Sequence, residues 1–401
     1  MNVTPLALHS SRAVRDALRS SRAVREALCS HGWETELAEN AAVGIETAAF
    51  HLTALDQGAI EALVPFAGGL GLEVVTGDSW AIVAGSRSRL SVLARPWSVP
   101  EPLRELAQGI ALVLPGEPVT NWQTARGEVS LEHAVLIGIL NVTPDSFSDG
   151  GRFAQVDAAL AQGERLLRDG AALLDIGGES TRPGRTESVP EDEELRRVLP
   201  VIEALVREHP SLILSVDTVK ARVAEAALNA GAAIVNDVSA LRLDGAMAGV
   251  VARANAGIIL MHSRGSILEL ASYKHAEYGG DVVGGVIREL REALERAAQG
   301  GVGPQATVVD PGFGFGKTVE QNMVLLDQLP ALQALGRPIL VGPSRKRFLG
   351  VVSGLSVEER DRVTATACAL AAERGARLFR VHAVAETRET LALTQSLGVL
   401  A

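Results

Sequence analysis

Residues 134–151 read AVLIGILNVTPDSFSDGG, an apolar run that ends at Leu140 and a polar, glycine-containing segment that begins at Asn141. The run is short, continuous and rich in Val, Ile and Leu, which is typical of a strand buried on both faces. Similar runs recur toward the C-terminus, separated by amphipathic stretches of helical period. The eight runs are Val135–Leu140, Ala172–Ile176, Leu212–Val216, Ala232–Val235, Ala256–Met261, Ala306–Val309, Pro338–Val341 and Leu378–Val381.

Short apolar strands that are each followed by a helix predict an α/β domain with a parallel sheet covered on its outer face. Eight such units in about 270 residues favour a (β/α)8 TIM barrel, which we expect within residues 126–401, with its strands and helices over about 134–401. An open, doubly wound sheet is the alternative that the strand pattern leaves open.

The N-terminal third follows a different pattern. Residues 1–30 contain a tandem repeat, SSRAVRDAL at Ser10–Leu18 and SSRAVREAL at Ser20–Leu28, which we interpret as an Arg-rich helical tail; a partner-binding arm is the alternative. Residues 31–125 predict a small α/β module of unknown function, with short strands at Ala48–Thr53, Leu72–Val75 and Trp80–Ala84. Because we find no cluster of reactive side chains in this module, the chemistry is expected in the barrel.

Composition limits the class of partner and the compartment. The chain is 47% apolar, and its formal net charge of −10 argues against a nucleic-acid partner, which usually requires a basic face. No stretch of 18 or more apolar residues occurs, so we expect no membrane partner. Only Cys29 and Cys368 are present, with no CxxC pair and no export signal, which together predict a cytoplasmic protein.

In a TIM barrel the reacting groups lie on the loops that follow the carboxyl ends of the strands. Each of the eight apolar runs is followed there by an ionisable or amide side chain. In strand order, these are Asn141; Glu179 and Arg182; Asp217; Asn236 and Asp237; His262; Asp310; Ser344, Arg345 and Lys346; Arg380 and His382. A strand-end Asp often caps the next helix, but capping does not explain all eight ends at once.

These side chains divide by chemistry. Asp217, Asn236 and Asp310 are short acceptors or amides, which suit the N–H-rich edge of a flat heterocycle, and Lys346 could donate to its carbonyl edge. Arg182, Arg380 and His382 are donors that suit a phosphate or a carboxylate. The neutral oxygen of Asn141 could complete the coordination shell of Mg²⁺. The sequence therefore predicts a site for a flat polar ring, a diphosphate and a metal ion.

Two loops at this end are rich in Gly, Ser and Pro, namely Phe147–Phe153 (FSDGGRF) and Glu179–Thr186 (ESTRPGRT). We expect them to close over a bound ligand, although ordinary surface loops have the same composition. A third segment, PGFGFGKT at Pro311–Thr318, is close to a phosphate-binding Walker loop, but Pro311 replaces its first glycine.

The motifs resemble those of the dihydropteroate synthase family. Six of them occur in the family's order: GILNVTPDSFSDGG (138–151), LLDIGGESTRPG (173–184), SVDT (215–218), NDVSA (236–240), DPGFGFGKT (310–318) and GPSRKRF (342–348). Members of this family join 4-aminobenzoate to 6-hydroxymethyl-7,8-dihydropterin diphosphate with release of diphosphate, and the resemblance implies the same folate-pathway reaction, Mg²⁺ as cofactor and a homodimer.

The resemblance also implies roles for individual residues. The pterin would be held by Asp217, Asn236, Asp310 and Lys346. The diphosphate would be held by Asn141, Thr181, Arg380 and His382, with Asn141 also at the metal. The aminobenzoate site would comprise Phe147, Thr181, Arg182, Pro183, Phe315 and Arg347. The catalytic set would be Asp149, Asp217, Asp310 and Lys346, with Asp149 on the closing loop.

Two positions depart from the family pattern. Ala383 stands where an Asp usually follows the eighth-strand His, and Arg347 stands where some relatives have a Ser. A pterin-dependent methyltransferase and a non-catalytic pterin-binding protein are the alternatives, but neither requires the diphosphate-binding motifs.

Overall fold

The structure is a computed structural model that describes residues 2–6, 47–95, 97, 99–113, 119–143, 152–179 and 187–396. The chain divides into two compact units, one formed by Met1–Glu117 with Pro330–Gly336 and the other by Pro118–Leu329 with Arg337–Ala401. The inclusion of Pro330–Gly336 in the first unit was not predicted. The tandem repeat at 10–28 lies outside the described residues.

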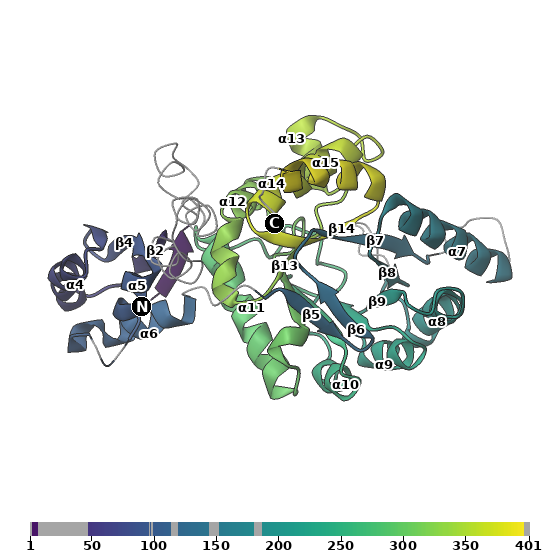
Figure 1. Ribbon diagram of the computed structural model, residues 1–401, viewed down its shortest axis with the longest axis horizontal. Coiled ribbons are helices and arrows are strands. Elements are labelled where there is room, and N and C mark those ends of the chain that lie inside the picture. The colour runs from purple at the N-terminus through teal and green to yellow at the C-terminus, as the bar shows by residue number, and fades with distance from the viewer. Residues whose placement is uncertain are drawn as a thin grey trace, which may run out of the picture. The chain divides into compact units, whose positions relative to one another are not determined.

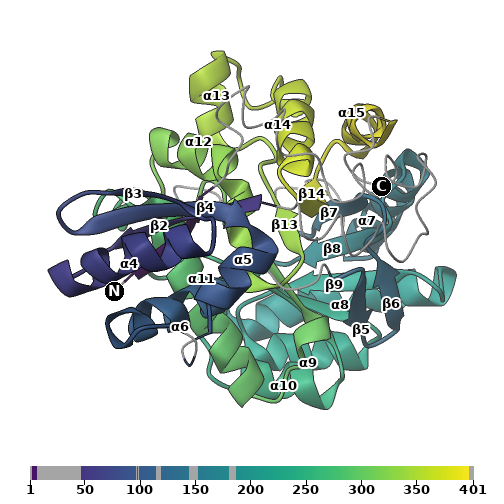
Figure 2. The ribbon, with the colours of Figure 1, turned by 60° about the vertical axis from the view of Figure 1, so that its left-hand side comes forward.

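The first unit contains a four-stranded antiparallel sheet with the strand order β1-β2-β4-β3 (Figure 2). Its elements are β1 (Asn2–Leu6), β2 (Thr47–Thr53), α4 (Gln57–Gly69), β3 (Glu73–Thr76), β4 (Trp80–Ser86), α5 (Arg87–Leu93) and α6 (Arg104–Val113). The sheet and helices enclose an apolar core that includes Phe50, Leu63, Leu106 and Ala334. Strand β1 differs from the prediction, which placed these residues in a helical tail.

The second unit is a closed barrel of eight parallel strands, which confirms the predicted TIM-barrel fold (Figure 1). The strands are β7 (Val135–Asn141), β8 (Leu173–Gly177), β9 (Ile213–Asp217), β10 (Ile234–Asp237), β11 (Gly257–Met261), β12 (Thr307–Asp310), β13 (Ile339–Val341) and β14 (Ala376–Val381). The helices are α7 (Arg152–Asp169), α8 (Glu191–Glu208), α9 (Ala221–Asn229), α10 (Met247–Arg253), α11 (Val282–Gln299), α12 (Val319–Asp327), α13 (Arg347–Ser353), α14 (Asp361–Glu373) and α15 (Val384–Ser396).

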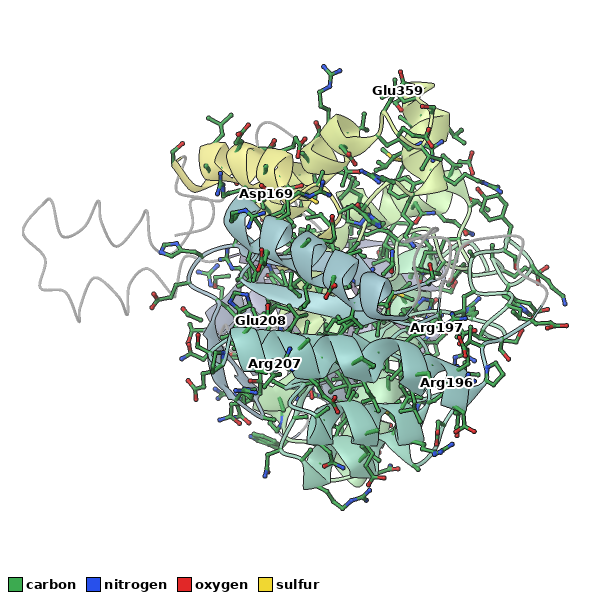
Figure 3. All side chains as sticks on the ribbon, turned by 90° about the vertical axis from the view of Figure 1, so that its right-hand side faces the viewer. Asp169, Arg196, Arg197, Arg207, Glu208 and Glu359 are labelled. Atoms are coloured by element: carbon green, nitrogen blue, oxygen red, sulfur yellow. The ribbon has the colours of Figure 1, made fainter. Side chains whose placement is uncertain are left out.

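Burial explains why the strand sequences are continuously apolar. Every residue of β8 and β11 is buried, because the inner face fills the barrel and the outer face meets the helices. The helices are amphipathic, and the outer surface of α8 carries charged side chains such as Arg196, Arg207 and Glu208 (Figure 3). No helix among the described residues is both long and apolar enough to cross a membrane.

A short hairpin, β5 (Asn121–Thr124) and β6 (Gly127–Ser130), closes the amino end of the barrel. Trp122 is fully buried among barrel residues and donates from Nε1 to the carbonyl of Ala306 at 2.9 Å. The hairpin belongs to the second unit and spans the domain boundary that we predicted at residues 125 and 126. Since this end is packed, the opposite, carboxyl end of the strands is the one available for a site.

Candidate active site

Strand register brings the predicted polar residues together at the carboxyl ends of the strands. Asn141 pairs laterally with Gly177, Gly177 with Asp217, and Asp217 with Asn236. On the other side of the barrel, Asp310 is the last residue of β12, and Arg380 precedes the last residue of β14. Parallel pairing therefore converts similar positions in separate sequence motifs into one polar ring.

A cleft of about 730 Å³ opens at this ring. Among the predicted site residues, those that line it are Asn141, Asp217, Lys346, Arg347, Arg380 and His382. Three others, Asn236, Asp310 and Phe315, are buried, with exposed fractions of 3%, 4% and 6%. Because Asp217, Lys346 and Arg380 line one cavity and Asp310 interacts electrostatically with Lys346 and Arg380, the charged residues of the site are gathered rather than scattered.

Arg380 bridges two buried carboxylates at the centre of the site. Its Nε donates to Asp175 Oδ2 at 2.5 Å, and its Nη2 donates to Asp217 Oδ2 at 2.8 Å. The same Asp175 oxygen accepts a hydrogen bond from Asn236 Nδ2 at 2.9 Å. Burial raises the pKa of Asp217, Arg380 opposes this rise, and Asp175 adds to it. We predicted that Arg380 serves an anionic ligand; in this structure two of its nitrogens hold carboxylates, and Arg380 also lines the cleft.

Asp310 and Lys346 form a second pair of opposite charges. Asp310 Oδ1 accepts from the backbone N–H of Gly312 at 2.7 Å, and burial raises its pKa to about 6. Burial, together with the nearby charge of Arg380, lowers the pKa of Lys346 to about 7. Lys346 Nζ lies 3.5 Å from the ring centroid of Phe315, a cation–π contact that joins the predicted pterin and aminobenzoate sites.

Ser344 orients His382 in the absence of the acidic neighbour that Ala383 replaces. Ser344 Oγ accepts from the His382 backbone N–H at 3.1 Å and lies 2.9 Å from its ring Nδ1. When Ser344 donates its hydroxyl proton to Nδ1, the imidazole proton lies on Nε2. This tautomer offers an N–H donor from a residue that lines the cleft.

At the edge of the cleft, the guanidinium of Arg347 lies 4.1 Å from the ring centroid of Tyr273, and its Nε donates to the Tyr273 hydroxyl at 3.0 Å. Both residues line the cleft. A cation therefore lies at the edge of the cleft, and its contact with aminobenzoate stays a prediction. The other predicted residues, Phe147, Asp149, Thr181, Arg182 and Pro183, lie outside the described residues, as do most of the two loops that carry them.

Two other strand-end residues serve the fold. The carboxylate of Asp237 accepts hydrogen bonds from the N–H groups of Ser239 and Leu241, so it holds the turn that follows β10 rather than capping α10, which begins at Met247. His262 is buried and contacts Lys317 and Glu289. Position at a strand end therefore does not by itself make a residue part of the cleft.

Three charged residues near the site were not predicted from the sequence, namely Asp175, Lys220 and Lys317. Asp175 has an exposed fraction of 0%, and its Oδ1 has no hydrogen-bond partner among the residues that the structure describes. The sequence did contain a sign that Asp175 has a polar partner, because a carboxylate inside the apolar run LLDIG must be compensated when it is buried. Lys220 donates to Glu179 Oε2 at 2.6 Å and also contacts Glu194, which fixes the first residue of the predicted Glu179–Thr186 loop.

Comparison with known proteins agrees with this geometry. Residues 137–382 match the model of the pterin binding enzyme family. The chain is 43% identical over 253 residues to a dihydropteroate synthase of Bacillus subtilis, which covers 63% of this chain and 85% of that protein. It is 45% identical over 269 residues to the dihydropteroate synthase of Mycobacterium leprae, which covers 66% of this chain and 93% of the relative.

Two solved structures from Xanthomonas albilineans are also similar. A dihydropteroate synthase with 4-aminobenzoic acid has 46% identity and a TM-score of 0.64, and the match covers 70% of this chain and 99% of the other. The enzyme in complex with 7,8-dihydropteroate has 45% identity and a TM-score of 0.60, and the match covers 68% and 96%. The family match spans more than half of the chain and includes all the strands that form the cleft. The chain belongs to the dihydropteroate synthase family of pterin binding enzymes.

Proposed function

We propose that this chain condenses 6-hydroxymethyl-7,8-dihydropterin diphosphate with 4-aminobenzoate to give 7,8-dihydropteroate and diphosphate. The observation that carries the proposal is the arrangement of carboxylates, an amide and cations around one cleft. Relatives of 43% and 45% identity are dihydropteroate synthases, and a similar solved structure contains dihydropteroate.

The charges of the cleft suit the two halves of the pterin substrate. Asp217 and Asp310 supply carboxylates for the amino-amidine edge of the ring, where two parallel hydrogen bonds can form. Lys346, adjacent to Asp310, supplies a donor for the carbonyl edge. Because the carboxylates are desolvated, their bonds to a bound ring are stronger than they would be in water.

The difficult step is departure of diphosphate from the exocyclic methylene. The electron-rich dihydropterin can delocalise the developing positive charge, which favours a dissociative path without a protein nucleophile. The chain's own task is to hold the anion, and the His382 Nε2–H provides a preorganised donor for it. The cleft then keeps the amine of 4-aminobenzoate in line with the methylene carbon.

The donor set at the mouth fits a Mg²⁺ ion that is carried largely by substrate oxygens. A Cβ added to Gly177 would lie 3.5 Å from Asn141 Oδ1 and 3.7 Å from Asp217 Oδ2, so the absence of a side chain leaves room between these two oxygens. Mg²⁺ commonly takes one or two protein ligands and completes its shell with phosphate and water. When bound through Asn141, it would neutralise charge on the diphosphate.

The test is diphosphate release when the purified chain is mixed with the pterin diphosphate, 4-aminobenzoate and Mg²⁺, with dihydropteroate identified by mass spectrometry. Replacement of Asp310 by Ala should lower turnover by roughly 10²–10³-fold, the scale of one preorganised polar contact. Pterin binding without turnover would contradict the proposal and favour a carrier, and methyl transfer to cobalamin would favour a methyltransferase.

We also infer a cytoplasmic homodimer. Exposed apolar side chains on the last three helices support the pairing: Val351 and Val352 of α13, Leu370 of α14 and Leu393 of α15 have exposed fractions of 62%, 59%, 39% and 65%. Burial of such residues between two copies would contribute favourable free energy. Sedimentation equilibrium measures the mass, and a monomer at micromolar concentration would contradict the inference.

A further inference from the structure

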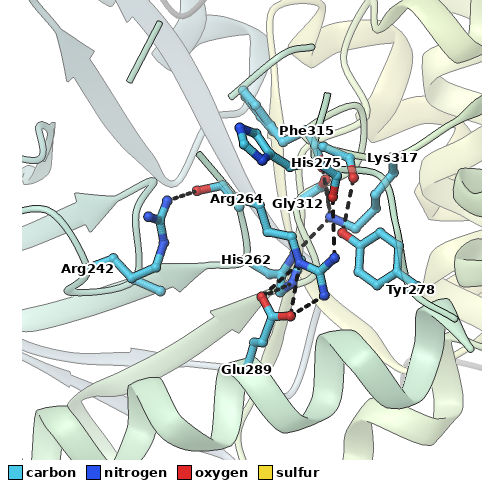
Figure 4. A network of polar contacts seen from close by, with 12 residues as sticks. Arg242, His262, Arg264, His275, Tyr278, Glu289, Gly312, Phe315 and Lys317 are labelled. Carbon is cyan, nitrogen blue, oxygen red and sulfur yellow. Dashed lines mark hydrogen bonds and ion pairs between the residues drawn. The ribbon is translucent and has the colours of Figure 1, made fainter. Parts of the chain in front are cut away.

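Lys317 is a fully buried lysine that the reaction described above does not use, and its exposed fraction is 0%. Its Nζ donates to the carbonyls of Gly312 and Phe315, each at 3.0 Å, and lies 2.9 Å from His262 Nδ1 (Figure 4). The two carbonyls belong to the turn between β12 and α12. The side chain thus returns to the backbone of its own turn and ties it to the end of β11.

The remaining contacts show that Nζ is a donor to all three groups. His262 Nε2 lies 3.1 Å from Glu289 Oε2, a carboxylate that accepts, so the imidazole proton lies on Nε2 and Nδ1 is an acceptor. Three acceptors around one nitrogen require three N–H groups, which only the ammonium form of Lys provides. Although burial lowers the pKa of Lys317, this geometry favours the protonated form.

Contacts of Arg264 and Tyr278 hold His262 and the turn in place. Arg264 Nε donates to Glu289 Oε1 at 2.9 Å, and its guanidinium lies 3.8 Å from the ring centroid of Tyr278 (Figure 4). The Tyr278 hydroxyl donates to the carbonyl of Gly316 at 3.1 Å. The turn is therefore held through three of its backbone carbonyls: Lys317 binds those of Gly312 and Phe315, and Tyr278 binds that of Gly316.

The turn contributes Gly314 and Lys317 to the lining of the cleft and contacts two further residues of the site. The N–H of Gly312 holds Asp310, the Phe315 ring supports Lys346 Nζ, and Gly314 lies against the Lys346 side chain, where an added Cβ would be 2.9 Å from Cδ. Lys317 binds the carbonyls of Gly312 and Phe315 at the same distance, and Phe315 is the one of the two whose side chain contacts Lys346.

We propose that Lys317 is a positioning residue for the aminobenzoate half of the product: its ammonium fixes the 312–317 turn so that Phe315 lies under Lys346 at the junction between the two substrates. The proposal rests on the proposed function, because it assigns Phe315 to the aminobenzoate site. Lys317 borders the cleft, but its exposed fraction is 0% and its Nζ is taken up by the turn and His262. Its effect on binding passes through the turn.

The test compares two ligands of the full-length chain by calorimetry, 7,8-dihydropteroate and 6-hydroxymethyl-7,8-dihydropterin. Replacement of Lys317 by Met removes all three hydrogen bonds and should weaken dihydropteroate binding by about tenfold or more, the scale of one to two lost buried hydrogen bonds. Pterin binding should weaken by less than dihydropteroate binding, because Asp217 and Asn236 lie on other strands and only Asp310 and Lys346 contact the turn. The K317R variant keeps the charge and should recover part of the loss.

Lys274 provides a matched control, since it is a mostly exposed lysine that pairs with Glu269 on the neighbouring segment. Its replacement by Met should leave both affinities unchanged. If K317M does not fold, H262L, which removes one of the three acceptors, should give a smaller loss of the same kind. Equal weakening of both ligands, or no weakening of dihydropteroate, would overturn the proposal. Binding needs no turnover, so an inactive wild-type chain would contradict the proposed function and leave this comparison decisive.

Discussion

At the scale of single residues, the site places Asp310 and Lys346 where each must be charged to hold a pterin, yet burial brings their pKa values to about 6 and about 7. Below about pH 6 Asp310 gains a proton, and above about pH 7 Lys346 loses one. Pterin affinity should therefore be greatest near neutral pH and fall by up to about tenfold per pH unit on either side. Calorimetric titration between pH 5 and pH 9 measures this profile.

The alkaline limb can be assigned with one substitution. In K346R the guanidinium stays protonated throughout, so the loss of affinity above pH 7 should disappear while the acid limb remains. Persistence of the alkaline limb in K346R would assign it to another group.

The pH dependence of folding stability through Asp310 has the opposite sign to that of pterin binding. Because the pKa of Asp310 is raised in the folded state, its contribution to stability is present below its unfolded pKa and is lost as the pH rises through about 6.

At the scale of elements, the turn between β12 and α12 requires glycine because its backbone crosses another strand end. Gly312 has a φ of +68°, and an added Cβ would lie 2.0 Å from the carbonyl oxygen of His262. Gly279 has a φ of +60°, but an added Cβ would meet nothing within 4 Å. Replacement by Ala should cost about 1 kcal/mol at Gly279, from backbone strain alone, and several times more at Gly312. Urea unfolding of both variants measures the difference, and equal costs would contradict the role of the crossing.

The same elements show how far the sequence could predict the structure. The eight strands were predictable because each is a local apolar run, and the position of Asn141, Asp217, Asn236 and Asp310 followed from where those runs end. The bridge from Arg380 to Asp175 was not predictable in this way, since its partners are 205 residues apart and only barrel closure brings them together. Strand β1 was missed for a similar reason: Asn2–Leu6 is strand only because it pairs with Thr53 to Ala49.

At the scale of the whole molecule, we expect the barrel to be sufficient for the reaction, because a solved relative leaves almost no residues of its own for a counterpart of the first unit. A solved relative is matched over 99% of its own chain by 70% of this one. The first unit, in turn, contains Pro330–Gly336, and Ala334 belongs to its apolar core with an exposed fraction of 7%. If a protease site is placed between Glu117 and Pro118, cleavage should leave diphosphate release within about twofold of the intact chain, because domains of this size keep their own cores.

The N-terminal fragment should nevertheless remain bound after cleavage, because residues 330–336 contribute Ala334 to the apolar core of the first unit and cleavage does not disturb that core. In A334D a charge would replace a buried methyl group without a partner, so the cleaved fragment should separate during size-exclusion chromatography. Q333D adds the same charge at the neighbouring exposed position and should retain the fragment. If the fragment separates from the unsubstituted chain, the segment is too weak an anchor to define the unit. If diphosphate release is lost when the fragment separates, the first unit is required for the reaction.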